Sequence, residues 1–152
     1  MLKGNGGREP RSVLLSDSIV RPSSRQLVMF AGVTRDFYEI HYDADYARAN
    51  GFPGVVVPGS LKACWIAQVI QQWGGFQASL RELNVSYRGV DLVNDEFTIT
   101  GKVSKIHLAR EGARIVQLAL TGRNSQRVTT FAEASVVLPE DVEVELENAD
   151  LP

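Results

Sequence analysis

Cysteine and histidine are scarce in this sequence of 152 residues, which contains one cysteine and two histidines. Because Cys64 has no second cysteine to pair with, an internal disulfide and a zinc site built on several cysteines are both excluded. Two histidines without a carboxylate cluster around them also argue against a transition-metal site, since such sites use three or four ligands. We therefore expect neither a metal nor a redox cofactor.

A strong charge of either sign is also absent, because 16 basic and 18 acidic residues give a formal net charge of −2. No basic stripe occurs, so the sequence lacks the electrostatic footprint of a nucleic-acid-binding protein. No run approaches the roughly 18 apolar residues of a membrane-spanning helix, and the first residues lack the apolar centre of a signal peptide. We expect a cytoplasmic protein with no nucleic-acid or membrane partner.

What the sequence does contain is the composition of one globular domain, with 44% hydrophobic and 22% charged residues. Residues 1–12 are rich in glycine and charge, and residues 139–152 are acidic. Polar ends of this kind bury too little apolar surface to offset the entropy lost on ordering. We therefore expect a domain over residues 13–138, a loose N-terminal segment at 1–12 and a flexible acidic tail at 139–152.

Two short helices are predicted in the first third of the chain. Ser23 or Ser24 can cap a helix over residues 25–34, because a serine oxygen accepts a hydrogen bond from a free amide of the first turn. Asp43 can cap a second, shorter helix in the same way, and Gly51 ends it.

The strongest helical pattern covers residues 60–73, with Ser60 expected as its cap and Gly74 and Gly75 as its end. Its first turns are apolar on nearly every side, and Cys64 lies among these apolar residues. A helix that is hydrophobic all round is typically buried. We therefore expect this helix at the centre of the core, with Cys64 as a small inert apolar residue.

The rest of the chain has the alternating pattern of β-strands. One short strand is expected near residues 12–20. Later strands are expected in the segments "LNVSYRG", "DEFTITGKV", "RIVQLALTG" and "RVTTFAEASVVLP". Early helices and late antiparallel strands together predict an α+β fold, in which one antiparallel sheet wraps around the buried helix. This is the arrangement of the hot-dog fold.

The stretch "TRDFYEIHYD" at residues 34–43 places Asp36 and His41 five positions apart, between two predicted helices. A solvated turn is the simplest interpretation of such a stretch. Loops on a rigid scaffold often carry function, however, and Gly59 begins the buried helix 18 residues after His41. Unpaired backbone N–H groups and the helix dipole at Gly59 could stabilise an oxyanion.

These residues resemble the signature of the MaoC-like dehydratases, which include the (R)-specific enoyl-CoA hydratases. That signature reads S-G-D-x-N-P-x-H-x-D, followed by a helix and a buried stretch that ends in H-G. This chain has "TRDFYEIHYD" and then "GVVVPG". The chain departs from the signature at three positions, where Tyr38 replaces Asn, Glu39 replaces Pro and Pro58 replaces His. In "TRDFYEIHYD" and "QQWGG" it resembles the small subunits of actinobacterial steroid side-chain hydratases, which work paired with a second hot-dog chain.

The resemblance implies reversible syn hydration of a trans-2-enoyl-CoA to a (R)-3-hydroxyacyl-CoA. Asp36 and His41 would be the catalytic pair, and the Gly59 N–H would polarise the thioester carbonyl, with Ser60 and Tyr38 beside the substrate. Coenzyme A would arrive as part of the substrate, and the protein would form a homodimer or a heterodimer with a related subunit. A hot-dog acyl-CoA thioesterase and a non-catalytic acyl-CoA-binding subunit remain alternatives.

Overall fold

The structure is a computed structural model of the chain that describes residues 11–108 and 113–145. In chain order, its elements are β1 (Arg11–Ser12), β2 (Leu14–Val20), α1 (Ser24–Thr34), the 3₁₀ helix η1 (Glu39–His41), α2 (Ala44–Ala49), α3 (Gly59–Gly74), β3 (Ser79–Tyr87), β4 (Phe97–Leu108), β5 (Arg114–Arg123), β6 (Val128–Leu138) and β7 (Val144–Glu145).

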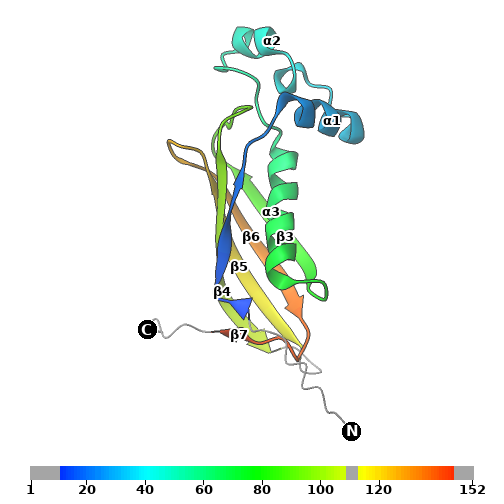
Figure 1. Cartoon of the computed structure of the whole chain (residues 1–152), viewed down its shortest axis with the longest axis vertical. Coiled ribbons are helices and arrows are strands. Elements are labelled where there is room, and N and C mark those ends of the chain that lie inside the picture. Colours follow the sequence, from blue (N-terminus) through cyan, green and yellow to red (C-terminus); the bar gives the residue numbers. More distant parts are fainter. Residues whose placement is uncertain (1–10, 109–112, 146–152) are drawn as a thin grey trace.

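Five strands form one antiparallel sheet in the order β2-β4-β5-β6-β3, so β2 and β3 are its edges. The long helix α3 lies along one face of this sheet, while α1, η1 and α2 lie together beyond the N-terminal end of α3 (Figure 1). The turns after β3 and β5 lie at this same end of the molecule (Figure 1). The sheet is therefore a platform that holds the start of α3 close to the short helices.

The core lies between α3 and the inner face of the sheet. Alternate residues of the central strands point to this face, as the period of two requires. The buried apolar residues of α3 and the central strands are Leu61, Trp65, Ile66, Val69, Ile70, Phe97, Ile99, Val116, Leu118, Leu120, Ala132, Ala134, Val136 and Leu138. The expected α+β arrangement, with one antiparallel sheet around a long helix, is confirmed.

The burial of α3 differs from the sequence prediction in one respect. The sheet covers only one side of the helix, so Cys64 and Gln68 are exposed, and Ala63 and Ala67 are half-buried. The expectation of an inert, buried Cys64 is therefore wrong. Small and apolar residues made the whole helix look like core, although half of its surface faces away from the sheet.

The start of α3 also differs from the prediction. Pro58 occupies the N-cap position, and no side-chain oxygen caps the helix. Ser60 is exposed within the first turn, so its expected capping role is wrong. The other two predicted caps are confirmed, because Ser23 Oγ accepts from Gln26 N–H and Asp43 accepts from the first amides of α2.

Two substitutions on α3 test which of its faces is buried. Ile66 is fully buried, so Ile66→Ala should lower the free energy of unfolding by about 2–5 kcal/mol, through lost transfer energy and the cavity left behind. Cys64→Ala, two residues away on the exposed face, should change it by less than about 0.5 kcal/mol. Urea denaturation of both variants measures the difference; equal losses would contradict the one-sided burial.

The segment after β6 packs onto the sheet as far as residue 145. Val142 is buried, and Arg114 donates two hydrogen bonds to the backbone oxygens of Glu140 (2.8 Å) and Val142 (2.7 Å). β7 then pairs in parallel with β1. Residues 139–145 were expected in a flexible tail, but an apolar valine anchors them. The remainder of that tail, and residues 1–10 of the expected loose N-terminal segment, lie outside the described residues.

Candidate active site

The turn between α1 and η1 carries the two candidate catalytic residues. α1 ends at Arg35, whose backbone is left-handed (φ 58°, ψ 26°) and turns the chain sharply. Asp36 follows directly, and His41 is the last residue of η1. The Tyr42 hydroxyl donates to the Phe37 carbonyl (2.9 Å), which holds this turn against η1. The five-residue spacing in sequence thus becomes a compact turn with both side chains on it.

His41 is buried, and its Nδ1 lies 2.7 Å from the carbonyl oxygen of Val56. Because a carbonyl oxygen can only accept, Nδ1 carries a proton and donates it there. In the neutral imidazole, Nε2 is then left as a proton acceptor. The Val56 N–H in turn donates to Ile40 O (2.9 Å), so the backbone holds Val56 beside η1, and the bond from Nδ1 to Val56 O fixes the tautomer of the ring.

Nε2 of His41 faces Asp36, with 3.9 Å between Nε2 and Oδ2. This separation is too long for a direct hydrogen bond, but a water at about 2.8 Å from both atoms would fit between them. The Asp36 side chain is 43% exposed and that of His41 is 11% exposed, so the carboxylate lies at the surface and the imidazole lies below it. The two groups can therefore act on one small molecule from the same side.

Tyr38 packs against this pair. Its ring meets His41 edge-to-face, with 6.0 Å between ring centroids, and meets Tyr46 in the same way at 6.2 Å. Its backbone N–H points at Oδ1 of Asp36 over 3.5 Å, the outer limit of a hydrogen bond. The Tyr38 side chain thus supports the histidine ring by packing, and its half-exposed ring forms part of the surface next to Asp36.

Gly59 and Ser60 each provide one unpaired backbone donor at the start of α3. The amides of Leu61 and Lys62 both donate to Pro58 O (3.1 and 3.2 Å), whereas those of Gly59 and Ser60 have no acceptor in the described parts of the chain. In a helix of 16 residues, these free N–H groups form the positive end of the dipole. A Cβ at position 59 would lie 3.0 Å from the Tyr87 ring, which explains the glycine.

The segment before Gly59 connects the two halves of the site. Residues 55–58 are buried. Two backbone hydrogen bonds join them to the loop after β3: Val57 N–H donates to Asp91 O (2.8 Å), and Val93 N–H donates to Val55 O (3.0 Å). The acceptor of the His41 proton, Val56 O, lies three residues before Gly59. The same short segment therefore positions both the imidazole and the unpaired amides.

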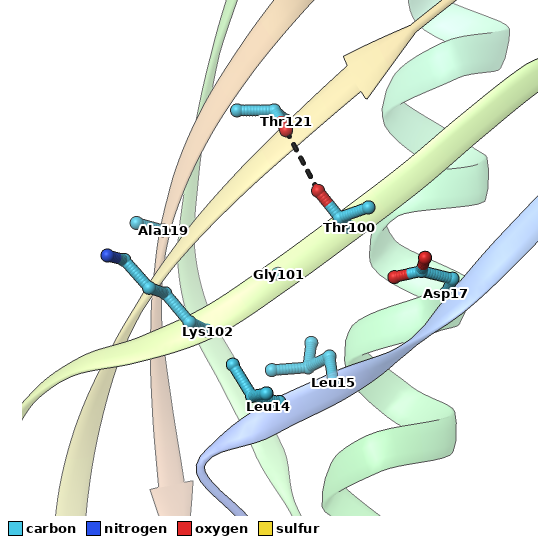
Figure 2. Close-up of a pocket in the computed structure, with 8 residues that line it drawn as sticks. All are labelled: Leu14, Leu15, Asp17, Thr100, Gly101, Lys102, Ala119 and Thr121. Atoms are coloured by element: carbon cyan, nitrogen blue, oxygen red, sulfur yellow. Dashed lines mark hydrogen bonds between the residues drawn. The ribbon is translucent and has the colours of Figure 1, made fainter. Parts of the chain in front are cut away.

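Three surface pockets lie away from Asp36, His41 and Gly59. The one shown in Figure 2 holds about 310 Å³ and lies on the face of the sheet away from α3, where Thr100 and Thr121 hydrogen bond across two strands (3.0 Å). Its lining includes neither Asp36, His41 nor Gly59. The ionisable side chains that line it are Asp17 and Lys102, and no histidine lies among its lining residues. Within residues 11–108 and 113–145, no three His, Cys, Asp or Glu side chains converge on a metal-sized site.

Sequence reasoning missed three residues beside Gly59, namely Lys62, Asp91 and Tyr87. Lys62 and Asp91 form an ion pair of 2.8 Å that is buried on both sides. The available signal was a lysine within an otherwise apolar helix pattern. Burial, and next the nearby Cys64 thiol, raise the pKa of the Tyr87 hydroxyl above its ordinary value, so this hydroxyl keeps its proton at neutral pH.

Comparisons with known proteins identify the family and the fold. A family model described as MaoC like domain matches residues 7–123. The (R)-hydratase from A. caviae involved in PHA biosynthesis is similar in structure, with a TM-score of 0.76, 23% identity, and 88% of this chain and 99% of that chain covered.

The R-hydratase PhaJ1 from Pseudomonas aeruginosa has a TM-score of 0.73 and 20% identity, with 95% of this chain and 90% of that chain covered. A chain of the ChsH1-ChsH2 complex from Mycobacterium tuberculosis has a TM-score of 0.75 and 20% identity, with 85% and 98% covered. A search of curated proteins returned no match. These likenesses confirm the hot-dog fold.

Among the described residues, no helix has the length and apolar character needed to cross a membrane.

Proposed function

The chain belongs to the MaoC-like dehydratase family, and we propose that it is an enoyl-CoA hydratase that adds water reversibly to a trans-2-enoyl-CoA, giving a (R)-3-hydroxyacyl-CoA. The observation that carries this proposal is the Asp36–His41 pair, in which Nε2 and Oδ2 face each other over 3.9 Å. A hydratase needs a base for water and an acid for the α-carbon, and this pair offers both on one side of a substrate.

The chemistry follows from those positions. One member of the pair removes a proton from a water held between them, and the water oxygen forms a bond to the β-carbon of the enoyl group. The electron pair of the double bond moves toward the thioester oxygen. As it returns, the Asp36–His41 pair passes the proton taken from the water to the α-carbon, and so ends in the protonation state in which it began. Because both groups face the same water, we assign the two proton transfers to the pair as a whole.

The negative charge that develops on the thioester oxygen needs a donor that is already in place. We assign this role to the Gly59 N–H, which has no acceptor within the described residues and lies at the positive end of α3. Ser60 N–H is the neighbouring unpaired donor. Preorganised donors of this kind are effective because they need no reorganisation during the reaction.

The acyl group would lie against the aromatic surface around the pair. Phe37, Tyr38 and Tyr42 are all exposed on the turn that carries Asp36 and His41. Exposed apolar side chains next to a polar pair are typical of a site for a large apolar ligand. We therefore propose a bulky acyl group, of the steroid-derived kind, rather than a short one.

The test is a panel of trans-2-enoyl-CoA thioesters that range from short chains to polycyclic acyl groups. We expect loss of the conjugated enone absorbance without release of free thiol, and a (R)-3-hydroxyacyl product by chiral chromatography. Release of free coenzyme A would instead identify a thioesterase, in which a carboxylate activates water against the carbonyl. Binding of the thioesters without any turnover would identify a non-catalytic subunit.

We further propose that the chain works as a dimer, either with itself or with a related hot-dog subunit. β3 is an edge strand with unpaired backbone groups, and Phe76, three residues before it, is 98% exposed. The exposed side of α3 adds further surface of small residues. The ChsH1-ChsH2 complex, which is similar in structure, contains two different chains.

Light scattering at micromolar concentration should give at least twice the mass of one chain, either for the purified protein or for a complex with a co-expressed hot-dog subunit. Because edge pairing satisfies open backbone groups and covers an exposed aromatic ring, we expect the association to survive dilution through the micromolar range. A monomer in both preparations would contradict this assignment.

A further inference from the structure

A buried ion pair lies one helical turn from Gly59. Lys62 Nζ is 2.8 Å from Asp91 Oδ2, and the two side chains are only 3% and 2% exposed. Lys62 belongs to the first turn of α3, whereas Asp91 belongs to the loop between β3 and β4. The pair therefore ties the start of the central helix to a loop 29 residues further along the chain.

Asp91 is held from several directions at once. Thr129 Oγ1 donates to both of its carboxylate oxygens (3.0 and 2.7 Å), and Asn124 Nδ2 donates to Oδ1 (3.1 Å). Its backbone carbonyl accepts the hydrogen bond from Val57 N–H. Asp91 thus joins the start of α3, the segment before it, and the β5–β6 turn at one end of the molecule (Figure 1).

Stability alone does not account for this pair. Removing two charges from water is costly, and an apolar pair of similar volume is often as stable or more so. Lys62 also lies near the positive end of a helix, where a cation is disfavoured. A buried pair in such a place is expected only where it fixes a geometry that apolar packing would leave loose.

The geometry in question is that of Tyr87 and Gly59. Lys62 Nζ lies 5.2 Å from the centroid of the Tyr87 ring and 5.8 Å from that of Phe97, within the range of a cation–π contact. The Tyr87 ring in turn touches the position that a Cβ of Gly59 would occupy, at 3.0 Å. Lys62 is therefore in contact with the ring that borders the unpaired Gly59 amide.

We propose that Lys62 and Asp91 are positioning residues for the oxyanion donor: together they fix the first turn of α3 and the Tyr87 ring, so that the Gly59 N–H meets the thioester oxygen. This inference rests on the proposed hydratase function. The pair touches no reacting atom, and it acts through the placement of Gly59. Misplacement by about 1 Å far from the chemistry can cost about 10²-fold in rate.

The test replaces the pair by apolar residues of similar size in the double variant Lys62→Met/Asp91→Leu. We expect a moderately lowered Tm, because Thr129 and Asn124 lose their acceptor, together with a kcat for hydration lowered by about 10–100-fold and a KM changed by less than about threefold. The matched control is Arg21→Gln/Glu96→Gln, which removes an exposed ion pair of 2.9 Å and should leave kcat unchanged.

A spectroscopic measurement separates positioning from a general structural role. In an Asp36→Asn background, which should bind an enoyl-CoA without hydrating it, a well-placed donor shifts the absorbance of the bound enone to longer wavelength. We expect the shift with Lys62 and Asp91 present and a smaller shift with the apolar pair.

A second variant, Thr129→Val, tests the inference if the double variant does not fold. It keeps the ion pair but removes the hydrogen bonding of the threonine to Asp91. We then expect a several-fold loss of kcat and a reduced shift of the enone absorbance.

Two outcomes would overturn the inference. One is a double variant, or a Thr129→Val variant where the double variant is unfolded, with unchanged kcat and an unchanged shift. The other is a loss of kcat that is matched in the Arg21/Glu96 control. Failure of the proposed function looks different, because the wild-type chain would then hydrate no enoyl-CoA, alone or with a co-expressed partner.

Discussion

The variants Asp36→Asn and His41→Gln should each lower kcat/KM for enoyl-CoA hydration by about 10²–10⁴-fold, the range typical of general acid–base groups. Asn cannot exchange a proton at this position, and Gln lacks the imidazole Nε2 that faces Asp36. Because the two groups act on one water, the double variant should be hardly slower than either single one. The measurement is the rate of enone loss with a substrate that the wild-type protein accepts.

Two exposed residues of the same chemical types serve as matched controls for this prediction. Glu39→Gln changes an exposed acid on η1, and His107→Gln changes the other histidine, which is exposed on β4. Both should keep the wild-type rate, and all four single variants should keep acyl-CoA binding and the wild-type fold. If Asp36→Asn and His41→Gln hydrate the substrate at near-wild-type rates, the pair is not catalytic and the binding-subunit alternative gains support.

The second large effect is expected for Gly59→Pro, which removes the backbone N–H that we assign to the oxyanion. Proline is tolerated in the first turn of a helix, and the extended backbone of Pro58 (ψ 135°) suits a following proline. Losing one such donor typically costs roughly 2.7–4 kcal/mol in the transition state, or about 10²–10³-fold in kcat. The fold should be retained, because this amide bonds to no other described residue.

Gly59→Ala is the matched control, since it adds a Cβ next to the Tyr87 ring but keeps the N–H. The ring contact of 3.0 Å requires Tyr87 to shift by a few tenths of an ångström. This is less than the displacement of about 1 Å that can cost about 10²-fold in rate, so we expect a much smaller loss of kcat than in Gly59→Pro. A difference of at least tenfold between the two variants, measured under saturating substrate, supports the amide as donor. Equal rates would place the oxyanion elsewhere.

Local patterns were sufficient to predict most of the fold. Apolar and polar residues alternate in β4, β5 and β6, which indicates a sheet with one buried face. Ser23 and Asp43 were recognisable as caps because each directly precedes a segment with a helical pattern. Residues far apart in sequence could not be placed in this way. The one-sided burial of α3 depends on which side the sheet covers. The large apolar residues lie on the buried side, but the alanines and the cysteine on the other side are also apolar and concealed this difference.

The candidate site was predictable only in part, for the same reason. Asp36 and His41 are close in sequence, so their spacing indicated the pair that the structure brings face to face. Lys62 and Asp91 are 29 residues apart, and only the packing of α3 against the loop after β3 brings them together. The absence of a capping side chain at Pro58 leaves the α3 amides unpaired, and sequence reasoning had assigned that cap to Ser60.

The most direct test of the central claim is the face to which the α-proton is added. A trans-2-enoyl-CoA that the protein accepts is hydrated in D₂O, and the position of deuterium relative to the new hydroxyl is determined by NMR coupling. Because Asp36 and His41 approach one water from the same side, with 3.9 Å between Oδ2 and Nε2, we predict one deuterium on the same face as the hydroxyl. Deuterium on the opposite face would contradict the account, since it would require an acid and a base on opposite sides of the substrate.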